Sequence, residues 1–136
     1  MKIHDVTLPI SPSLPVWPGD PAVVLEKVSS MDASAHDNVS RLACGVHTGT
    51  HVDAPHHFLN DGRTVEGLSL EILVGPVRVV EIPEDVQVVS AAVLQKAAIP
   101  SGTVRLLLKT RNSQLWERHQ QEFFPGFVGI SADVAD

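Results

Sequence analysis

Cysteine, positive charge and long apolar runs are all scarce in this 136-residue sequence. Its single cysteine, Cys44, excludes an intramolecular disulfide and favours a reducing compartment. Ten lysines and arginines stand against 16 acidic residues, and the basic residues form no cluster. Because a nucleic-acid-binding surface needs clustered positive charge, nucleic acid is not an expected partner. No apolar run approaches the roughly 20 residues of a membrane-spanning helix, so no membrane contact is expected.

The amino terminus carries no sign of a secretory signal, because Asp5 interrupts the first residues and no apolar stretch surrounds it. We therefore expect a cytoplasmic protein. A hydrophobic fraction of 43% argues against general disorder. The length suits one domain with its own core, and neither a repeat nor a low-complexity linker divides the sequence. Residues 1–136 are therefore expected to form a single domain.

The pattern of apolar residues predicts a mixture of strands and helices. Runs with β-branched or alternating residues indicate strands at residues 3–8, 22–28, 39–45, 76–82, 103–109 and 127–130. Helical segments are expected at residues 68–73, 89–98 and 113–121, with Ser90 placed to cap the second. Four prolines within residues 12–21 exclude a helix or interior strand there and predict a stiff loop. Strands dominate first and helices join later, which indicates a mixed α/β fold.

The stretch HTGTHVDAPHHF, which begins at His47, holds four of the seven histidines. If this stretch is an extended strand, residues of one parity point to one side, which groups His47, His51 and Asp53. The glycine between the two histidines lies on that same side and leaves room for their imidazoles to converge. Pro55 then turns the chain, so that His57 can return towards the same pocket.

Two imidazoles and a carboxylate form a donor set that suits Zn²⁺, and also Mn²⁺ or Fe²⁺. Such an ion lowers the pKa of bound water and polarises a carbonyl, the two requirements of amide or ester hydrolysis. A nearby histidine that is not a ligand can serve as general base and acid, and His57 is our choice for that role. The competing interpretation is a His-rich loop that binds nothing. The metalloprotease motif HExxH is absent, because Thr48 stands where its glutamate would be.

Three residues outside this stretch have structural as well as functional interpretations. Trp17, within the stiff loop, is either a core residue or a platform for a substrate. Asp20 lies in the segment PGDP and is interpreted as a turn residue rather than a catalyst. Cys44 is interpreted as a small buried packing residue rather than a ligand.

The histidine-rich stretch resembles the signature HxGTHxDxPxH of the cyclase family of metal-dependent hydrolases. That family includes bacterial kynurenine formamidase (arylformamidase) and isatin hydrolase. The resemblance continues along the chain in the family's order, at an aromatic-Pro-Gly-Asp loop and at several later segments. These are residues 17–20, 38–42, 61–62, 73–76, 104–110 and 129–131.

The resemblance implies a swivelling β/β/α domain that assembles into a homodimer or homotetramer. It also implies a divalent metal centre of one or two ions, with Zn²⁺ the first choice and Mn²⁺ the second. By position in the signature, His47, His51 and Asp53 correspond to metal ligands. His57 corresponds to the catalytic acid and base, and Trp17 to the aromatic residue of a candidate substrate-binding loop. The implied reaction is attack of metal-activated water on the carbonyl of a small-molecule formamide or cyclic amide.

The family pattern continues beyond the residues of this chain. A later histidine and glutamate complete the metal site of family members, and neither has a match here. Residues 131–136 look like an N-cap and the first turn of a helix, in which Ser131 is expected to accept from backbone N–H groups. We therefore expect the chain to be the amino-terminal portion of a longer domain. The alternative function is a catalytically incomplete fragment that serves only as a metal-binding or oligomerisation module.

Overall fold

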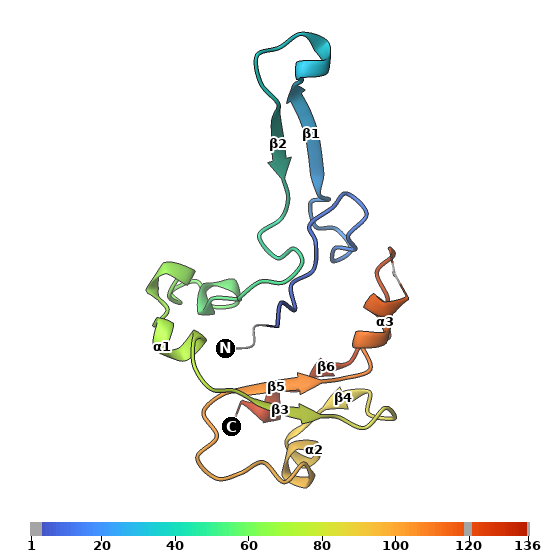
Figure 1. Cartoon of the computed structure of the whole chain (residues 1–136). Coiled ribbons are helices and arrows are strands. Elements are labelled where there is room, and N and C mark those ends of the chain that lie inside the picture. Colours follow the sequence, from blue (N-terminus) through green and yellow to red (C-terminus); the bar gives the residue numbers. More distant parts are fainter. Residues whose placement is uncertain (1–3, 119–120, 136) are drawn as a thin grey trace. The chain divides into compact units, whose positions relative to one another are not determined.

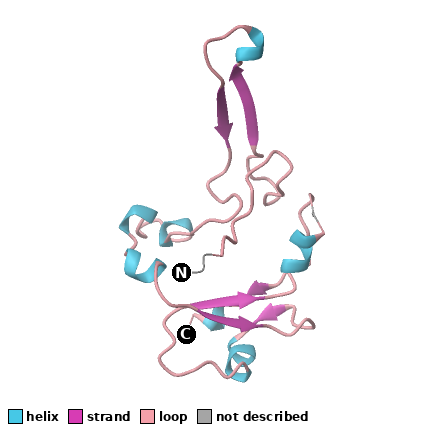
Figure 2. Cartoon of the chain, viewed as in Figure 1, coloured by secondary structure: helices cyan, strands magenta, loops and turns pink. Residues whose placement is uncertain are grey.

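A computed structural model describes residues 4–118 and 121–135 as short strands and helices joined by long loops (Figure 1). The strands are β1 (Val24–Ser29), β2 (Val39–Ala43), β3 (Arg78–Glu81), β4 (Val88–Val89), β5 (Leu106–Lys109) and β6 (Gly129–Ile130). The α-helices are α1 (Leu70–Leu73), α2 (Ala91–Lys96) and α3 (Ser113–Glu117). The 3₁₀ turns are η1 (Met31–Ala33), η2 (Pro55–His57), η3 (Val65–Gly67) and η4 (Ala132–Val134). This mixture of elements confirms the predicted α/β class (Figure 2).

The chain divides into two compact units. Unit 1 comprises residues 1–65 and 121–123, and unit 2 comprises residues 66–120 and 124–136. The expectation of one domain over residues 1–136 stays a prediction. No helix among the described residues is both long and apolar enough to cross a membrane.

Unit 1 contains the antiparallel pair β1–β2, with η1 at the tip of the hairpin (Figure 1). Leu25 lies opposite Leu42, and Glu26 lies opposite Arg41. The Arg41 guanidinium and the Glu26 carboxylate form an ion pair of 2.7 Å across the strands. Cross-strand apolar and opposite-charge pairs of this kind stabilise a hairpin and set its register. Both leucines remain more than half exposed, so the hairpin itself builds no core.

The segment before β1 forms the predicted stiff loop, without helix or strand in residues 4–23. The backbone N–H of Asp20 donates to the Trp17 carbonyl at 2.9 Å, and Gly19 has a φ of +98°. Proline followed by a glycine with positive φ is typical of a type II turn, which confirms that Asp20 lies in a turn. The strand predicted at residues 3–8 is wrong for residues 4–8. The Leu8 N–H donates instead to the Thr50 hydroxyl at 3.0 Å.

Unit 2 is built around two parallel strand pairs, β3–β5 and β4–β6. Val80, Ile82, Val89 and Val128 form its buried cluster, against which residues of α2 pack. The Ser90 hydroxyl accepts from the Val93 N–H at 3.4 Å, so the predicted cap of this helix is confirmed. Apolar side chains of β3 and β4, of Ile82 after β3 and of Val128 before β6 therefore meet apolar residues of α2.

Two sequence predictions in unit 2 are corrected by contacts that are remote along the chain. Val89 was assigned to the helix, but it belongs to β4, which pairs with β6 some forty residues later. Ser131 caps no helix with its side chain, because its hydroxyl donates to the Val89 carbonyl at 3.1 Å. The backbone after Ser131 forms only the 3₁₀ turn η4. The other predicted strands and helices are present with shifted or shortened ends, and residues 119–120 of the helix predicted at 113–121 lie outside the described residues.

Candidate metal centre

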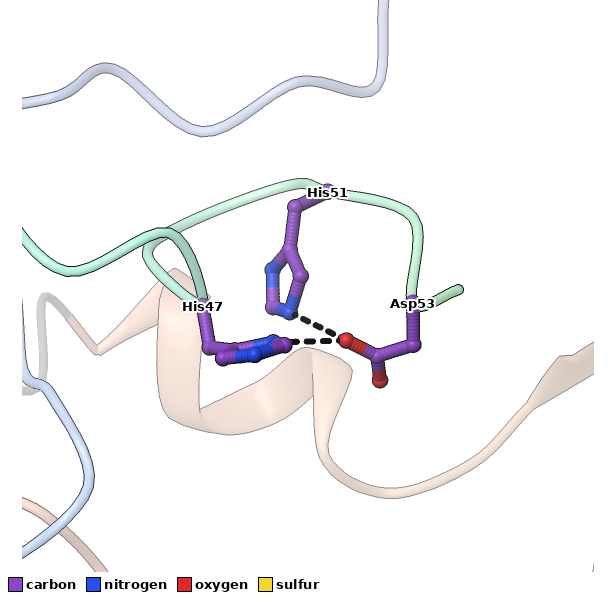
Figure 3. A group of neighbouring side chains, drawn as sticks. All are labelled: His47, His51 and Asp53. Carbon is purple, nitrogen blue, oxygen red and sulfur yellow. Dashed lines mark hydrogen bonds and ion pairs between the residues drawn. The ribbon is translucent and has the colours of Figure 1, made fainter. Parts of the chain in front are cut away.

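The candidate metal ligands lie on the loop that joins β2 to η2. The sequence analysis placed them on an extended strand, and this expectation is wrong, because no strand is found between residues 44 and 54. Gly49 has a φ of +63°, which is the left-handed region and breaks the alternation of an extended chain. His47, His51 and Asp53 nevertheless converge (Figure 3). The left-handed Gly49 lies between the two histidines in the chain and turns the backbone there.

Both imidazoles point at one carboxylate oxygen. His47 Nδ1 is 2.7 Å from Asp53 Oδ1, and His51 Nε2 is 3.3 Å from the same oxygen (Figure 3). The two rings lie edge to face, with centroids 5.3 Å apart. One possible ligand atom from each of the three residues lies within 4.8 Å of the other two. Each histidine side chain is 31% exposed, so the group is open to solvent.

The spacing of these atoms can be compared with a tetrahedral metal site. Two ligands at about 2.0–2.1 Å from a tetrahedral ion lie about 3.3 Å apart. The separation of His51 Nε2 and Asp53 Oδ1, 3.3 Å, already has this value. The His47–Asp53 distance of 2.7 Å is that of a hydrogen bond, which must lengthen when both atoms coordinate one ion. Nitrogen and oxygen donors in this arrangement fit Zn²⁺ or Mn²⁺.

Two threonines hold the ligand loop in place. Thr48 is the buried polar residue of the described chain, and its hydroxyl donates to the Gly45 carbonyl at 2.7 Å. The Thr50 hydroxyl accepts from the Leu8 N–H at 3.0 Å, which ties the loop to the amino-terminal segment. The sequence analysis missed both roles. Serine and threonine hydroxyls do bond to nearby backbone groups in turns, and this was the available signal for Thr48.

His57 returns towards the ligands, as predicted. Pro55 opens the 3₁₀ turn η2, and this turn carries His57 back until its ring centroid is 3.8 Å from that of His47. The His47 and His57 rings are tilted by 35° to each other. The Phe58 ring also lies against the His57 ring, with the two centroids 4.1 Å apart. His57 is not a member of the three-residue donor group. It is therefore placed beside a candidate ligand rather than among the ligands.

Trp17 and Cys44 both have exposed side chains. Trp17 is 57% exposed, and its ring lies edge-on to Phe123 at a centroid distance of 5.0 Å. It is thus a partly packed side chain with an accessible surface, and its substrate-binding role stays a prediction. Cys44 is exposed, so the interpretation as a buried packing residue is wrong.

Comparison with known proteins places these features in a family. Residues 4–136 match the family described as “Putative cyclase”. The chain belongs to this cyclase family. The match includes the whole histidine-rich stretch, and it confirms the resemblance seen in the signature.

Curated relatives in this family have longer sequences than this chain. The chain is 37% identical over 140 residues to cyclase-like protein 3 of Arabidopsis thaliana, covering 98% of the chain and 51% of that protein. It is 37% identical over 135 residues to kynurenine formamidase of Bacillus anthracis, covering 98% of the chain and 61% of that protein. The chain thus spans about half to three fifths of the length of these relatives.

Two solved structures resemble the cyclase-family chain along nearly its full length. One is described as a potential metal-dependent hydrolase with cyclase activity, with a TM-score of 0.74 and 30% identity over 98% of this chain and 60% of that one. The other is described as a predicted metal-dependent hydrolase from Bacillus stearothermophilus, with a TM-score of 0.72 and 29% identity over 98% of this chain and 62% of that one. The roles of the individual site residues stay predictions.

Proposed function

We propose that this chain is the ligand-bearing portion of a metal-dependent hydrolase that acts on small-molecule amides, in the manner of a kynurenine formamidase. The observation that carries the proposal is the convergence of His47, His51 and Asp53 on one point. The relative named kynurenine formamidase, which is 37% identical, supports the same class of reaction. In this proposal the domain is the swivelling β/β/α type, and residues 1–136 form its amino-terminal portion.

The proposal gives each residue of the loop a chemical role. His47, His51 and Asp53 hold a divalent ion, with Zn²⁺ the first choice, Mn²⁺ the second, and one or two ions per site. When bound, the ion supplies Lewis acidity to a carbonyl group and lowers the pKa of coordinated water. His57 accepts a proton from the attacking water and returns it to the leaving amine, a role that histidine side chains serve in general acid and base catalysis. Its ring is near enough to the His47 ring for such a position.

Substrate and assembly follow from the same proposal. The exposed face of Trp17 offers an aromatic surface on which a small-molecule substrate can stack. Three protein donors leave coordination positions open, which suits a catalytic rather than a structural metal site. Assembly as a homodimer or homotetramer in the cytoplasm is part of the proposal. The apolar side chains exposed on β1 and β2, such as Leu25 and Leu42, are consistent with burial against another surface.

A second candidate function is a metal-binding or oligomerisation module without catalysis. One observation favours it: the chain spans 61% of the kynurenine formamidase relative. A hydrolase of this kind needs further ligands to reach full activity, and the resemblance places a histidine and a glutamate in the later part of the family pattern. If a site lacked them, the three-donor group would bind an ion without completing the catalytic centre.

Release of formate from N-formylkynurenine distinguishes the two functions. The 136-residue chain is freed of metal, reloaded with Zn²⁺ or Mn²⁺, and assayed with a chelator-treated sample as control. Formate release that requires the reloaded ion supports the hydrolase. Stoichiometric metal without turnover of any formamide or cyclic amide supports the binding module. An absence of bound metal contradicts the hydrolase and the metal-binding module, and leaves only the oligomerisation module.

A further inference from the structure

Gly49 makes a specific backbone contact with one of the candidate ligands. Its carbonyl oxygen lies 2.9 Å from Nδ1 of His51, two residues later. The other ring nitrogen of His51, Nε2, faces Asp53 Oδ1 at 3.3 Å. The two nitrogens of this imidazole therefore have different partners, one on the backbone and one on a carboxylate.

These partners determine where the imidazole proton lies. A carbonyl oxygen can only accept a hydrogen bond, so Nδ1 must carry the proton in the contact with Gly49. A neutral imidazole has one N–H, which leaves a lone pair on Nε2. In this neutral form the lone pair faces Asp53 and can coordinate a cation, whereas without a cation a protonated Nε2 can donate to the same carboxylate oxygen. A backbone carbonyl that fixes the tautomer of a histidine ligand in this way raises metal affinity.

We propose that Gly49 is a positioning residue whose carbonyl selects the Nδ1–H tautomer of His51 and so presents Nε2 to a divalent cation. The inference rests on the proposed function in one respect, namely that the ligand of this site is a metal ion. The contact between Nδ1 and the Gly49 carbonyl is itself a property of the metal-free chain. His47 has a different arrangement, because its Nδ1 faces Asp53 and no backbone carbonyl is its partner among the described contacts.

The conformation that aims this carbonyl requires glycine. Gly49 has a φ of +63°, where a side chain with L chirality is strained. A Cβ atom on Gly49 would lie 3.3 Å from Leu14 Cδ2 and 3.9 Å from Ile10 Cγ1. The missing side chain thus faces apolar packing, and not the space between the imidazoles that the sequence analysis expected. Thr48 and Thr50 bind the loop on either side of Gly49, which limits its freedom to relax.

Nitrogen NMR of the metal-free chain tests the tautomer directly. The ¹⁵N shifts and couplings of the His51 ring distinguish protonated Nδ1 from protonated Nε2. At a pH at which the ring is neutral, the expected result is a proton on Nδ1 and none on Nε2. A ring with its proton on Nε2, or an equal mixture of the two forms, overturns the inference. This measurement needs no substitution and no metal.

Substitution of Gly49 tests the consequence for binding. Gly49→Ala should lower Zn²⁺ affinity about 10- to 100-fold, the usual loss when the partner of a metal ligand is removed. Gly102→Ala is the matched control, because Gly102 also has a positive φ, of +79°, but a Cβ there meets nothing within 4 Å, and affinity should stay unchanged. Gly49→Asn should recover part of the loss, because asparagine enters the left-handed region more readily than alanine.

The outcomes separate this inference from the proposed function. Zn²⁺ binding that is equally tight in the parent chain and in a folded Gly49→Ala variant overturns the positioning role and leaves the proposed function intact. A parent chain that binds no Zn²⁺ contradicts the proposed function, and the tautomer of His51 alone then decides the inference. If Gly49→Ala fails to fold by circular dichroism, Gly49→Asn and the NMR measurement decide it.

Discussion

Asp53 Oδ1 is shared by two histidines, at 2.7 Å from His47 Nδ1 and at 3.3 Å from His51 Nε2. One oxygen thus accepts a hydrogen bond and also occupies a position that a metal ligand can take. A bound cation and the His47–Asp53 hydrogen bond compete, because the ion needs a longer separation of these two atoms. Binding of an ion should therefore change the position of Asp53 relative to His47.

Replacement of this carboxylate should abolish tight metal binding. Asp53→Asn keeps the shape of the side chain but loses the negative charge. Zn²⁺ affinity should therefore fall by more than about 100-fold, which exceeds the usual loss when a residue that only hydrogen-bonds to a metal ligand is removed. Competition with a coloured chelator measures the dissociation constant. Asp61→Asn, at an acidic residue outside the donor group, is the control and should bind as the parent does. Equal binding by both variants would show that Asp53 is not a ligand.

Metal binding and catalysis should separate at His57. His57→Ala removes the ring stacked on His47 but none of the three donors, so bound metal should remain while formate release falls about 10²- to 10⁴-fold. His56→Ala is the matched control in the same turn, and its activity should stay near that of the parent. Metal analysis and the formate assay are made on the same samples. A His57→Ala variant that keeps full activity contradicts the assignment of His57.

The sequence predicts local features of this chain well, because they depend on near neighbours. The cap at Ser90 and the turn at Pro18–Gly19 need only residues within a few positions of each other. The convergence of His47 and Asp53 was also predicted, although by a wrong route. Parity along a strand gave the correct grouping, whereas the structure has a left-handed glycine between the two histidines.

The features that the sequence could not predict depend on remote partners. Strand β4 is two residues long and exists because β6 pairs with it, so its own residues carry no adequate signal. The expected first strand failed for the same reason, since Leu8 bonds to Thr50 rather than to a neighbouring strand. The contact between the Ser131 hydroxyl and Val89 is equally remote in sequence. Pairing across forty residues is a property of the folded chain and not of a local pattern.

Two valines on different strands of unit 2 should differ strongly in their effect on stability. Val89 is 1% exposed, whereas Val79 is 56% exposed on the outer face of β3. Val89→Ala should lower the free energy of unfolding by about 2 kcal/mol through lost burial and a residual cavity. Val79→Ala should change it by less than about 0.5 kcal/mol. Urea unfolding followed by Trp116 fluorescence, in a Trp17→Phe background, reports on this unit, and equal effects of the two variants would contradict the assigned core.

The carboxyl of Asp5 should titrate at unusually low pH. The hydroxyl and the backbone N–H of Thr7 donate to this carboxylate, and they hold the pKa of Asp5 below its usual value. The stability that these contacts provide is present above the unfolded pKa and is lost as the pH falls through the lower folded pKa. Thr7→Val should raise the pKa of Asp5, and Thr7→Ser should not, as measured by NMR of the side-chain carboxyl carbon. An unchanged pKa in Thr7→Val would contradict this account.

The central claim is that His47, His51 and Asp53 bind a divalent ion, and calorimetric titration of the metal-free chain with Zn²⁺ tests it most directly. We predict saturable binding that His51→Ala abolishes and that His36→Ala, at a histidine outside the ligand loop, leaves unchanged. At a free Zn²⁺ concentration 100 times the dissociation constant, binding should also stabilise the folded chain by about 2.7 kcal/mol. An absence of saturable binding, or binding that persists in His51→Ala, would contradict the account.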